Sequence, residues 1–196
     1  NWLEKMTSTV IRESGRVFIG ECGLDRWMHK PNIEEQKKAF ISQLALAAEY
    51  NLPISIHCLK AWGLLLEILK THHRPKRGFL LHSYGGSPDL VPELAALGAY
   101  FSFSGYFLRE EKKKVHEAFR RIPPDRVMVE TDAPDMLPPE RYRKYTLSTP
   151  ATNSLNHPAN LLSVVEGLAK ILEIRESHLR SLAFENFHSF FPVEHS

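Results

Sequence analysis

The sequence is poor in the features that mark several protein classes. It contains only two cysteines, Cys22 and Cys58, too few for a disulfide framework, so we expect a reducing, intracellular environment, cytoplasmic or nuclear. No apolar run approaches the roughly 18 residues of a membrane-spanning helix, and no basic-then-apolar start resembles a signal peptide, so we expect no membrane partner. The formal net charge is only +2, which excludes a polybasic arm for nucleic acid.

What remains is an ordinary globular composition. Of the 196 residues, 43% are hydrophobic and 24% are charged, which excludes disordered and collagen-like chains. This length fits one domain or a small pair of domains. Because the first residue is Asn1 and not Met, we expect the chain to begin inside a longer gene product.

Short apolar runs alternate with amphipathic stretches along the chain. The runs are bounded by Gly, Pro or charged residues, which is typical of strands buried on both faces. We expect strands over 17–20, 54–56, 79–81, 100–103 and 127–129, and helices over 33–50, 62–71, 88–97, 111–121, 157–172 and 177–187. This alternation predicts an α/β fold with a parallel sheet. The proline-rich stretch 133–157 shows no clear period and is predicted to be a long loop, which is long enough to be functional.

Ionisable residues follow four of the five predicted strands. Glu21, His57 and His82 come directly after their strands, and Asp132 lies close behind the fifth. The carboxyl ends of parallel strands meet at one edge of a sheet, where α/β proteins place their chemistry. Two imidazoles and two carboxylates are suitable ligands for Zn, Mn or Mg. A single His at a strand end is more often structural, but four such residues in successive units predict a metal site.

The two cysteines each follow one of these candidate ligands. Strand alternation points Cys22 and Cys58 away from the predicted site, and free cysteine packs readily in protein cores. We therefore expect buried structural thiols in preference to metal ligands.

Five segments together resemble the TatD-related deoxyribonuclease family. They occur in the family order and read IGECGLD (19–25), PISIH (53–57), LHSYGG (81–86), VETDAP (129–134) and NHPANL (156–161). The resemblance runs through essentially the whole chain. It implies a TIM-barrel hydrolase of the metallo-dependent type.

The resemblance also implies roles for single residues. Glu21 is similar to the family carboxylate that bridges two divalent metal ions, and His57 and His82 to imidazole ligands. Asp132 is similar to the carboxylate that binds metal and orients or deprotonates the attacking water. The implied activity is that of a deoxyribonuclease that attacks DNA ends with two ions of Mg, Mn or Zn, and single-stranded DNA is a candidate form of the substrate.

The sequence departs from the family pattern in several places. The His-x-His pair of the first family strand is absent, as is the later Gly-x-His-Pro turn. We therefore expect residues 1–196 to form a single TatD-like domain that lacks its N-terminal strands, with about five of eight βα units. Where the family often has Arg, this chain has Leu59 followed by Lys60, and Lys60 is a candidate phosphate contact. His157 stands where the family usually has Glu.

A basic segment after Asp132 is a second candidate for substrate binding. Arg141, Arg143 and Lys144 alternate with tyrosines, a combination that can hold a phosphate backbone and stack bases. A solvated surface loop would have the same composition. Asp25 is also open to two interpretations, since it could shape the site or cap the turn that follows it.

Two other functions fit the same residues. The ligand set is shared by barrel hydrolases of small esters or amides. Alternatively, the chain is a catalytically impaired fragment or isoform, because five strands do not close an eight-stranded barrel. The sequence does not specify an oligomeric state.

Overall fold

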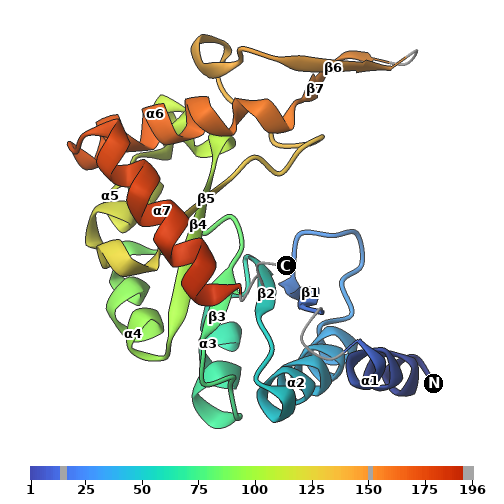
Figure 1. Ribbon diagram of the computed structural model, residues 1–196. Helices are drawn as coiled ribbons and strands as arrows, with labels where there is room; N and C mark the ends of the chain where they lie inside the picture. Colours follow the sequence, from blue (N-terminus) through green and yellow to red (C-terminus); the bar gives the residue numbers. More distant parts are fainter. Residues whose placement is uncertain (14–16, 150–151, 192–196) are drawn as a thin grey trace. The chain divides into compact units, whose positions relative to one another are not determined.

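The computed structural model describes residues 1–13, 17–149 and 152–191, which form two compact units. The first unit contains the described residues among 1–82, 96–100 and 188–191. The second unit contains the described residues among 83–95 and 101–187. Figure 1 labels the elements, and each unit is described by itself.

The first unit is a parallel α/β arrangement. Strand β1 (Ile19–Asp25) pairs in parallel with β2 (Ile54–Leu59), and β2 pairs in parallel with β3 (Phe79–Leu81). Helix α2 (Ile33–Tyr50) packs against β1 and α3 (Trp62–Thr71) against β2. An N-terminal helix, α1 (Trp2–Arg12), contacts α2.

Local sequence signals explain where α2 begins and ends. The Asn32 side chain accepts a hydrogen bond from the Glu35 amide at 3.2 Å, so it caps the helix start. At the other end Asn51 adopts a left-handed conformation, which a short polar side chain tolerates. Between these caps, Phe40 and Leu44 are fully buried and face the strands.

The second unit contains the remaining strands and most of the later helices. Strand β4 (Ala99–Ser104) starts in the first unit and enters the second at Phe101, where it pairs in parallel with β5 (Val127–Glu130). The sheet order is β1-β2-β3-β4-β5. The helices that follow β3 are α4 (Val91–Ala96), α5 (Lys113–Arg121), α6 (Leu161–Leu172) and α7 (Glu176–Phe190), and the 3₁₀ helices are η1 (Pro88–Leu90), η2 (Gly105–Leu108), η3 (Glu110–Lys112), η4 (Pro124–Arg126), η5 (Glu140–Tyr142) and η6 (Pro158–Asn160).

Aromatic packing forms much of the core of the second unit. Helix α6 lies against β5 and α5. The Phe103 and Phe119 rings meet edge to face with centroids 4.8 Å apart, and both side chains are buried. Edge-to-face contact is a favoured geometry for aromatic rings, so this pair helps to hold α5 on the sheet.

The predicted α/β class and parallel sheet are confirmed, and helices 33–50 and 62–71 have the predicted bounds. The prediction that the first strand covers 17–20 and stops before Glu21 is wrong. The strand runs over Ile19–Asp25 and contains an irregularity of register between Ile19 and Cys22. Similarly, β2 continues past His57 to Leu59. In both strands polar or glycine residues follow the apolar run, so the run of apolar residues in the sequence ends before the strand does in the structure.

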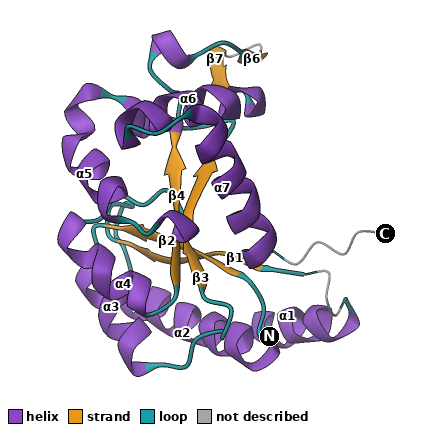
Figure 2. Cartoon of the chain, turned by 60° about the vertical axis from the view of Figure 1, so that its left-hand side comes forward, coloured by secondary structure: helices purple, strands orange, loops and turns teal. Residues whose placement is uncertain are grey.

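The stretch 133–157 is not the irregular loop that the sequence predicts. It contains an antiparallel hairpin of β6 (Thr146–Thr149) and β7 (Thr152–Asn156), which Figure 2 shows next to α6. Residues 150 and 151, between the two strands in the sequence, lie outside the described residues. All four residues of β6 are exposed, so no alternation of apolar and polar residues signals the strand. Over the described ranges, no helix is both long and apolar enough to cross a membrane.

Candidate metal centre

One carboxylate oxygen of Glu21 lies beside two imidazoles in the first unit. Glu21 Oε1 is 3.1 Å from His57 Nδ1 and 3.8 Å from His82 Nε2. The three residues come from β1, from β2 and from the position directly after β3. The structure thus brings together three of the four residues that the sequence predicts as metal ligands.

Strand geometry explains how these side chains reach one another. The irregular register around Glu21 has the character of a β-bulge, a feature that redirects side chains next to active sites. In β2 the side chains alternate, so Ile56 and Cys58 are buried while His57 is half-exposed between them. The His82 amide donates to the Ile56 carbonyl at 3.0 Å, which fixes His82 beside the same strand.

Asp25 contacts the second nitrogen of His57. Asp25 Oδ2 lies 3.3 Å from His57 Nε2, so His57 stands between two carboxylates. The hydrogen bond with Glu21 raises the pKa of His57 against the opposing effect of burial, and Asp25 adds to the rise. Reciprocally, the hydrogen bond from His57 lowers the pKa of Glu21, helped by the nearby His82. Glu21 is therefore ionised at neutral pH.

The other oxygen of Asp25 has a structural role. Asp25 Oδ1 accepts hydrogen bonds from the backbone amides of Trp27 at 2.6 Å and Met28 at 3.2 Å. Asp25 therefore both contacts the site and caps the turn after β1, which are the two functions that the sequence leaves open.

The donor types fit a divalent cation. Imidazole and carboxylate are the protein ligands of Zn and Mn, and carboxylate suits Mg. In the part of the chain that the structure describes, however, no three His, Cys, Asp or Glu side chains are grouped to hold an ion. Glu21 and Asp25 instead each hydrogen-bond to a ring nitrogen of His57. These side chains are of the types that bind a divalent metal ion, but the distances between their atoms, 3.1 and 3.3 Å, are those of hydrogen bonds.

Both cysteines are free, buried thiols, as predicted. Burial raises the pKa of Cys22 and of Cys58 to about 12. Both thiols therefore remain protonated at neutral pH. Because metal binding requires the thiolate, they are poor ligands.

Asp132, the fourth predicted ligand, belongs to the second unit. It follows β5 in a left-handed conformation with φ 56°, and its carbonyl accepts a hydrogen bond from the Asp135 amide at 2.9 Å. Such a backbone conformation is uncommon for residues other than glycine and often occurs at functional sites. Glu130, two residues earlier, accepts hydrogen bonds from the Ser83 and Ser102 hydroxyls.

Two buried amides hold the segment around Asp132. Both lie in the NHPANL segment (156–161), but neither is predicted from the sequence as a site residue. Asn156 Nδ2 donates to the carbonyls of Thr131 at 2.7 Å and Met136 at 3.3 Å. Asn160 Nδ2 donates to Asn156 Oδ1 at 3.0 Å. Both side chains are almost fully buried. The backbone on both sides of Asp132 is thereby fixed to the start of α6.

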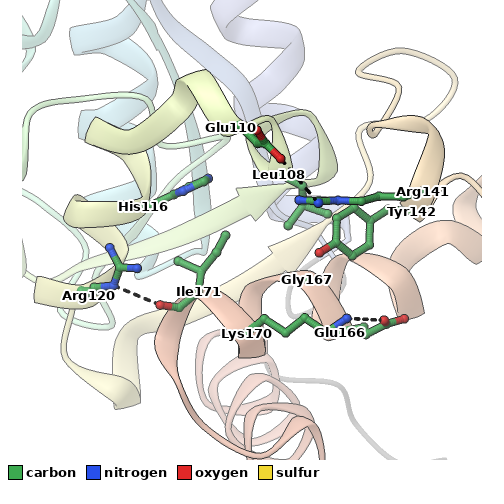
Figure 3. A pocket seen from close by; sticks show the side chains of 10 residues that line it. All are labelled: Leu108, Glu110, His116, Arg120, Arg141, Tyr142, Glu166, Gly167, Lys170 and Ile171. Atoms are coloured by element: carbon green, nitrogen blue, oxygen red, sulfur yellow. Dashed lines mark hydrogen bonds and ion pairs between the residues drawn. The ribbon is translucent and has the colours of Figure 1, made fainter.

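The basic segment after Asp132 is tied to its own unit. Arg141 Nη1 lies 3.6 Å from Glu110 Oε1, and Lys144 Nζ lies 3.2 Å from Glu166 Oε2. Arg143 donates to the Pro138 carbonyl at 3.3 Å. Arg141 lines a cavity of about 530 Å³, and Figure 3 shows its guanidinium directed toward Glu110. The cavity is lined by Leu108, Glu110, His116, Arg120, Arg141, Tyr142, Glu166, Gly167, Lys170 and Ile171.

Lys60, the candidate phosphate contact, belongs to the first unit and directly follows β2, the strand that carries His57. Its Nζ is 4.5 Å from the ring centroid of Trp27. Trp27 is not among the residues predicted from the sequence, although an aromatic residue two positions after the IGECGLD segment is a visible signal.

A parallel α/β fold with imidazoles and a carboxylate on adjacent strands is the arrangement expected of metallo-dependent hydrolases, a class with a TIM-barrel fold. Within it, the chain belongs to the TatD-related DNase family, whose model matches residues 1–192. This confirms the family indicated by the five sequence segments.

Individual relatives also point to the TatD family. The chain is 33% identical over 177 residues to an uncharacterized metal-dependent hydrolase, YabD, from Bacillus subtilis, covering 90% of the chain and 66% of the relative. It is 32% identical over 187 residues to the 3'-5' ssDNA/RNA exonuclease TatD of Klebsiella pneumoniae, covering 95% of the chain and 69% of the relative. The chain therefore spans about two thirds of the length of these relatives, and 57% of the TatD of Escherichia coli K12.

Solved structures confirm the predicted fold class. The crystal structure of YJJV, a TatD homologue from Escherichia coli K12, matches with a TM-score of 0.84 at 25% identity, over 97% of this chain and 70% of that chain. A TatD family hydrolase from Entamoeba histolytica matches with a TM-score of 0.77 at 19% identity, over 98% of this chain and 69% of that chain, which supports the fold alone.

Proposed function

We propose that this chain carries the metal centre of a hydrolase that cleaves phosphodiester bonds of nucleic acid, working from the end of a single strand. The observation that carries the proposal is the position of Glu21 Oε1 beside both His57 and His82. It is supported by family membership and by relatives named as metal-dependent hydrolases and as single-strand exonucleases.

Glu21, His57 and His82 are the residues that would hold the metal in the first unit. We propose two divalent ions, of Mg, Mn or Zn, for which Glu21 would be a common ligand by the family resemblance. Asp132, which follows β5 in the second unit, stays a candidate ligand and catalytic carboxylate on that resemblance alone. Bound divalent ions would neutralise phosphate charge and make water a stronger nucleophile near neutral pH.

The surrounding residues orient the proposed ligands and keep them in a charge state that suits metal binding. Asp25 accepts from His57 and so fixes the orientation of the ring, as carboxylates beside ligating histidines commonly do. The lowered pKa of Glu21 keeps its carboxylate ionised and ready to bind a cation. Asn156 and Asn160 hold the backbone next to Asp132 and act as positioning residues.

The test is nucleotide release from a labelled single-stranded DNA in the presence of Mg or Mn. We expect release by the wild-type chain and a loss of about 100-fold or more in Glu21→Gln, because the substitution removes a ligand charge. Glu49→Gln, at an exposed position on α2, is the matched control and should keep the wild-type rate. Equal rates in Glu21→Gln and wild type, or hydrolysis of small esters without DNA, would contradict the proposal.

A further inference from the structure

An exposed tryptophan stands next to the candidate metal centre. The Trp27 side chain is 66% exposed, and the neighbouring Met28 is 52% exposed. Single exposed aromatic residues are common on protein surfaces. Trp27 differs because the carboxylate that contacts His57, that of Asp25, also binds its backbone amide.

The segment that carries Trp27 is anchored on both sides. Asp25 Oδ1 accepts from the Trp27 amide at 2.6 Å, and the Arg26 amide donates to the Leu59 carbonyl at 3.0 Å. Gln36, on α2, exchanges two hydrogen bonds with the backbone of Asp25, at 2.7 and 3.0 Å. All these residues belong to the first unit. The backbone of Trp27 is therefore held in place relative to His57 by a two-step chain of contacts through Asp25.

A cation lies over the ring. Lys60 Nζ is 4.5 Å from the Trp27 ring centroid, within the range of a cation–π contact. Lys60 follows β2 directly and has a φ of 56°, an uncommon conformation for a residue with a side chain. The chain before α2 adds further positive charge, since residues 26–30 read Arg-Trp-Met-His-Lys without an acidic residue.

We propose that Trp27 and Lys60 form a nucleotide subsite in which a nucleobase of a single strand stacks on Trp27 while Lys60 contacts the adjacent phosphate. This inference rests on the function proposed above and names how the same centre holds its substrate. An aromatic ring beside cations is the combination by which proteins bind single strands without reading sequence. The positive charge around the ring favours this occupant over an apolar protein surface, which would leave Lys60 desolvated.

Binding of a short single-stranded DNA with phosphorothioate linkages, followed by fluorescence anisotropy, tests the subsite without requiring hydrolysis. We expect Trp27→Ala to weaken binding by about 10-fold, the order found for loss of one stacked base, and Trp27→Phe to retain most of the affinity. Trp2→Ala is the matched control, because Trp2 is also exposed, at 49%, but lies on α1. Wild-type affinity in Trp27→Ala would overturn the proposal.

A strand with abasic deoxyribose units separates stacking from a merely structural effect. Such a strand keeps the phosphates but offers no base, so wild type and Trp27→Ala should bind it equally. A penalty for Trp27→Ala that persists on the abasic strand would overturn the stacking role. Lys60→Gln should weaken both strands and lower the salt dependence of binding, and an unchanged salt dependence would overturn the phosphate contact.

The two proposals fail in different ways. If labelled DNA is bound in a Trp27-dependent manner but is not hydrolysed, the proposed function fails and the subsite stands. If hydrolysis depends on Glu21 while Trp27→Ala binds and cleaves like wild type, the subsite fails and the proposed function stands.

Discussion

Gly23 lies so close to His57 that no side chain fits between them. A Cβ atom at Gly23 would stand 1.9 Å from the His57 carbonyl oxygen, and the φ of Gly23 is +148°, a conformation that L residues rarely adopt. We predict that Gly23→Ala lowers the free energy of unfolding by about 3 kcal/mol or more, because β1 must move away from the strand that carries His57. Urea unfolding measures the change.

Gly63 is the control for that substitution. It lies on α3, and a Cβ there would meet nothing within 4 Å. Gly63→Ala should therefore stabilise the chain, by up to about 1 kcal/mol, since alanine is the better helix former. Equal changes in the free energy of unfolding for Gly23→Ala and Gly63→Ala would contradict the close approach of β1 to β2 at Gly23.

Asp25→Asn separates charge from hydrogen bonding at His57. The variant keeps an oxygen for the Trp27 and Met28 amides but loses the negative charge beside His57. We predict a 10- to 100-fold loss of metal affinity, the usual cost of losing an outer carboxylate partner, with little change in unfolding free energy. Calorimetric titration with Mn measures it. Unchanged affinity would mean that Asp25 serves only the turn.

The side chain of Asn160 is predicted to make a large contribution to the free energy of unfolding through its buried hydrogen bonds. Its side chain is fully buried and makes four hydrogen bonds, with the Lys144 and Tyr145 amides, the Tyr145 carbonyl and Asn156. Asn160→Ala leaves these buried groups without their hydrogen-bond partner, so we expect the free energy of unfolding in urea to fall by at least about 2 kcal/mol. Asn32→Ala, which removes a single exposed cap, should cost about 1 kcal/mol. A smaller loss at Asn160 than at Asn32 would contradict the network.

The carboxyl of Glu166 should titrate at unusually low pH. A hydrogen bond from Lys170, and a second from Lys144, lower its pKa. Because the folded-state pKa lies below the unfolded one, its stabilising effect is present above the unfolded pKa and is lost as the pH falls through the folded pKa. The effect is small, since these are surface pairs. In an NMR titration, Lys170→Met should raise the pKa of Glu166, and a normal pKa in wild type would contradict the pairing.

The architecture was largely predictable because its signals are local. Asn32 caps α2, apolar residues recur on one helix face, and the Phe79–Leu81 strand is a continuous apolar run. The β6–β7 hairpin was not predictable from pattern, because its first strand is exposed throughout and is held by backbone pairing. Pairing of that kind leaves no periodicity in the residues.

The candidate site was predictable only in part. Glu21, His57 and His82 were identified from their places behind apolar runs, and the structure brings them together. Asn156, Asn160 and Trp27 were not identified as functional residues, because their roles depend on contacts that sequence spacing does not reveal. Asn156, for example, holds the carbonyl of Thr131 from 25 positions away.

The most direct test is a titration of the chain with Mn²⁺ followed by electron paramagnetic resonance. If Glu21, His57 and His82 hold a divalent metal, the wild type and Glu49→Gln will bind Mn²⁺ saturably and in whole-number stoichiometry, and Glu21→Gln will not. Equal binding by wild type and Glu21→Gln would contradict the metal centre.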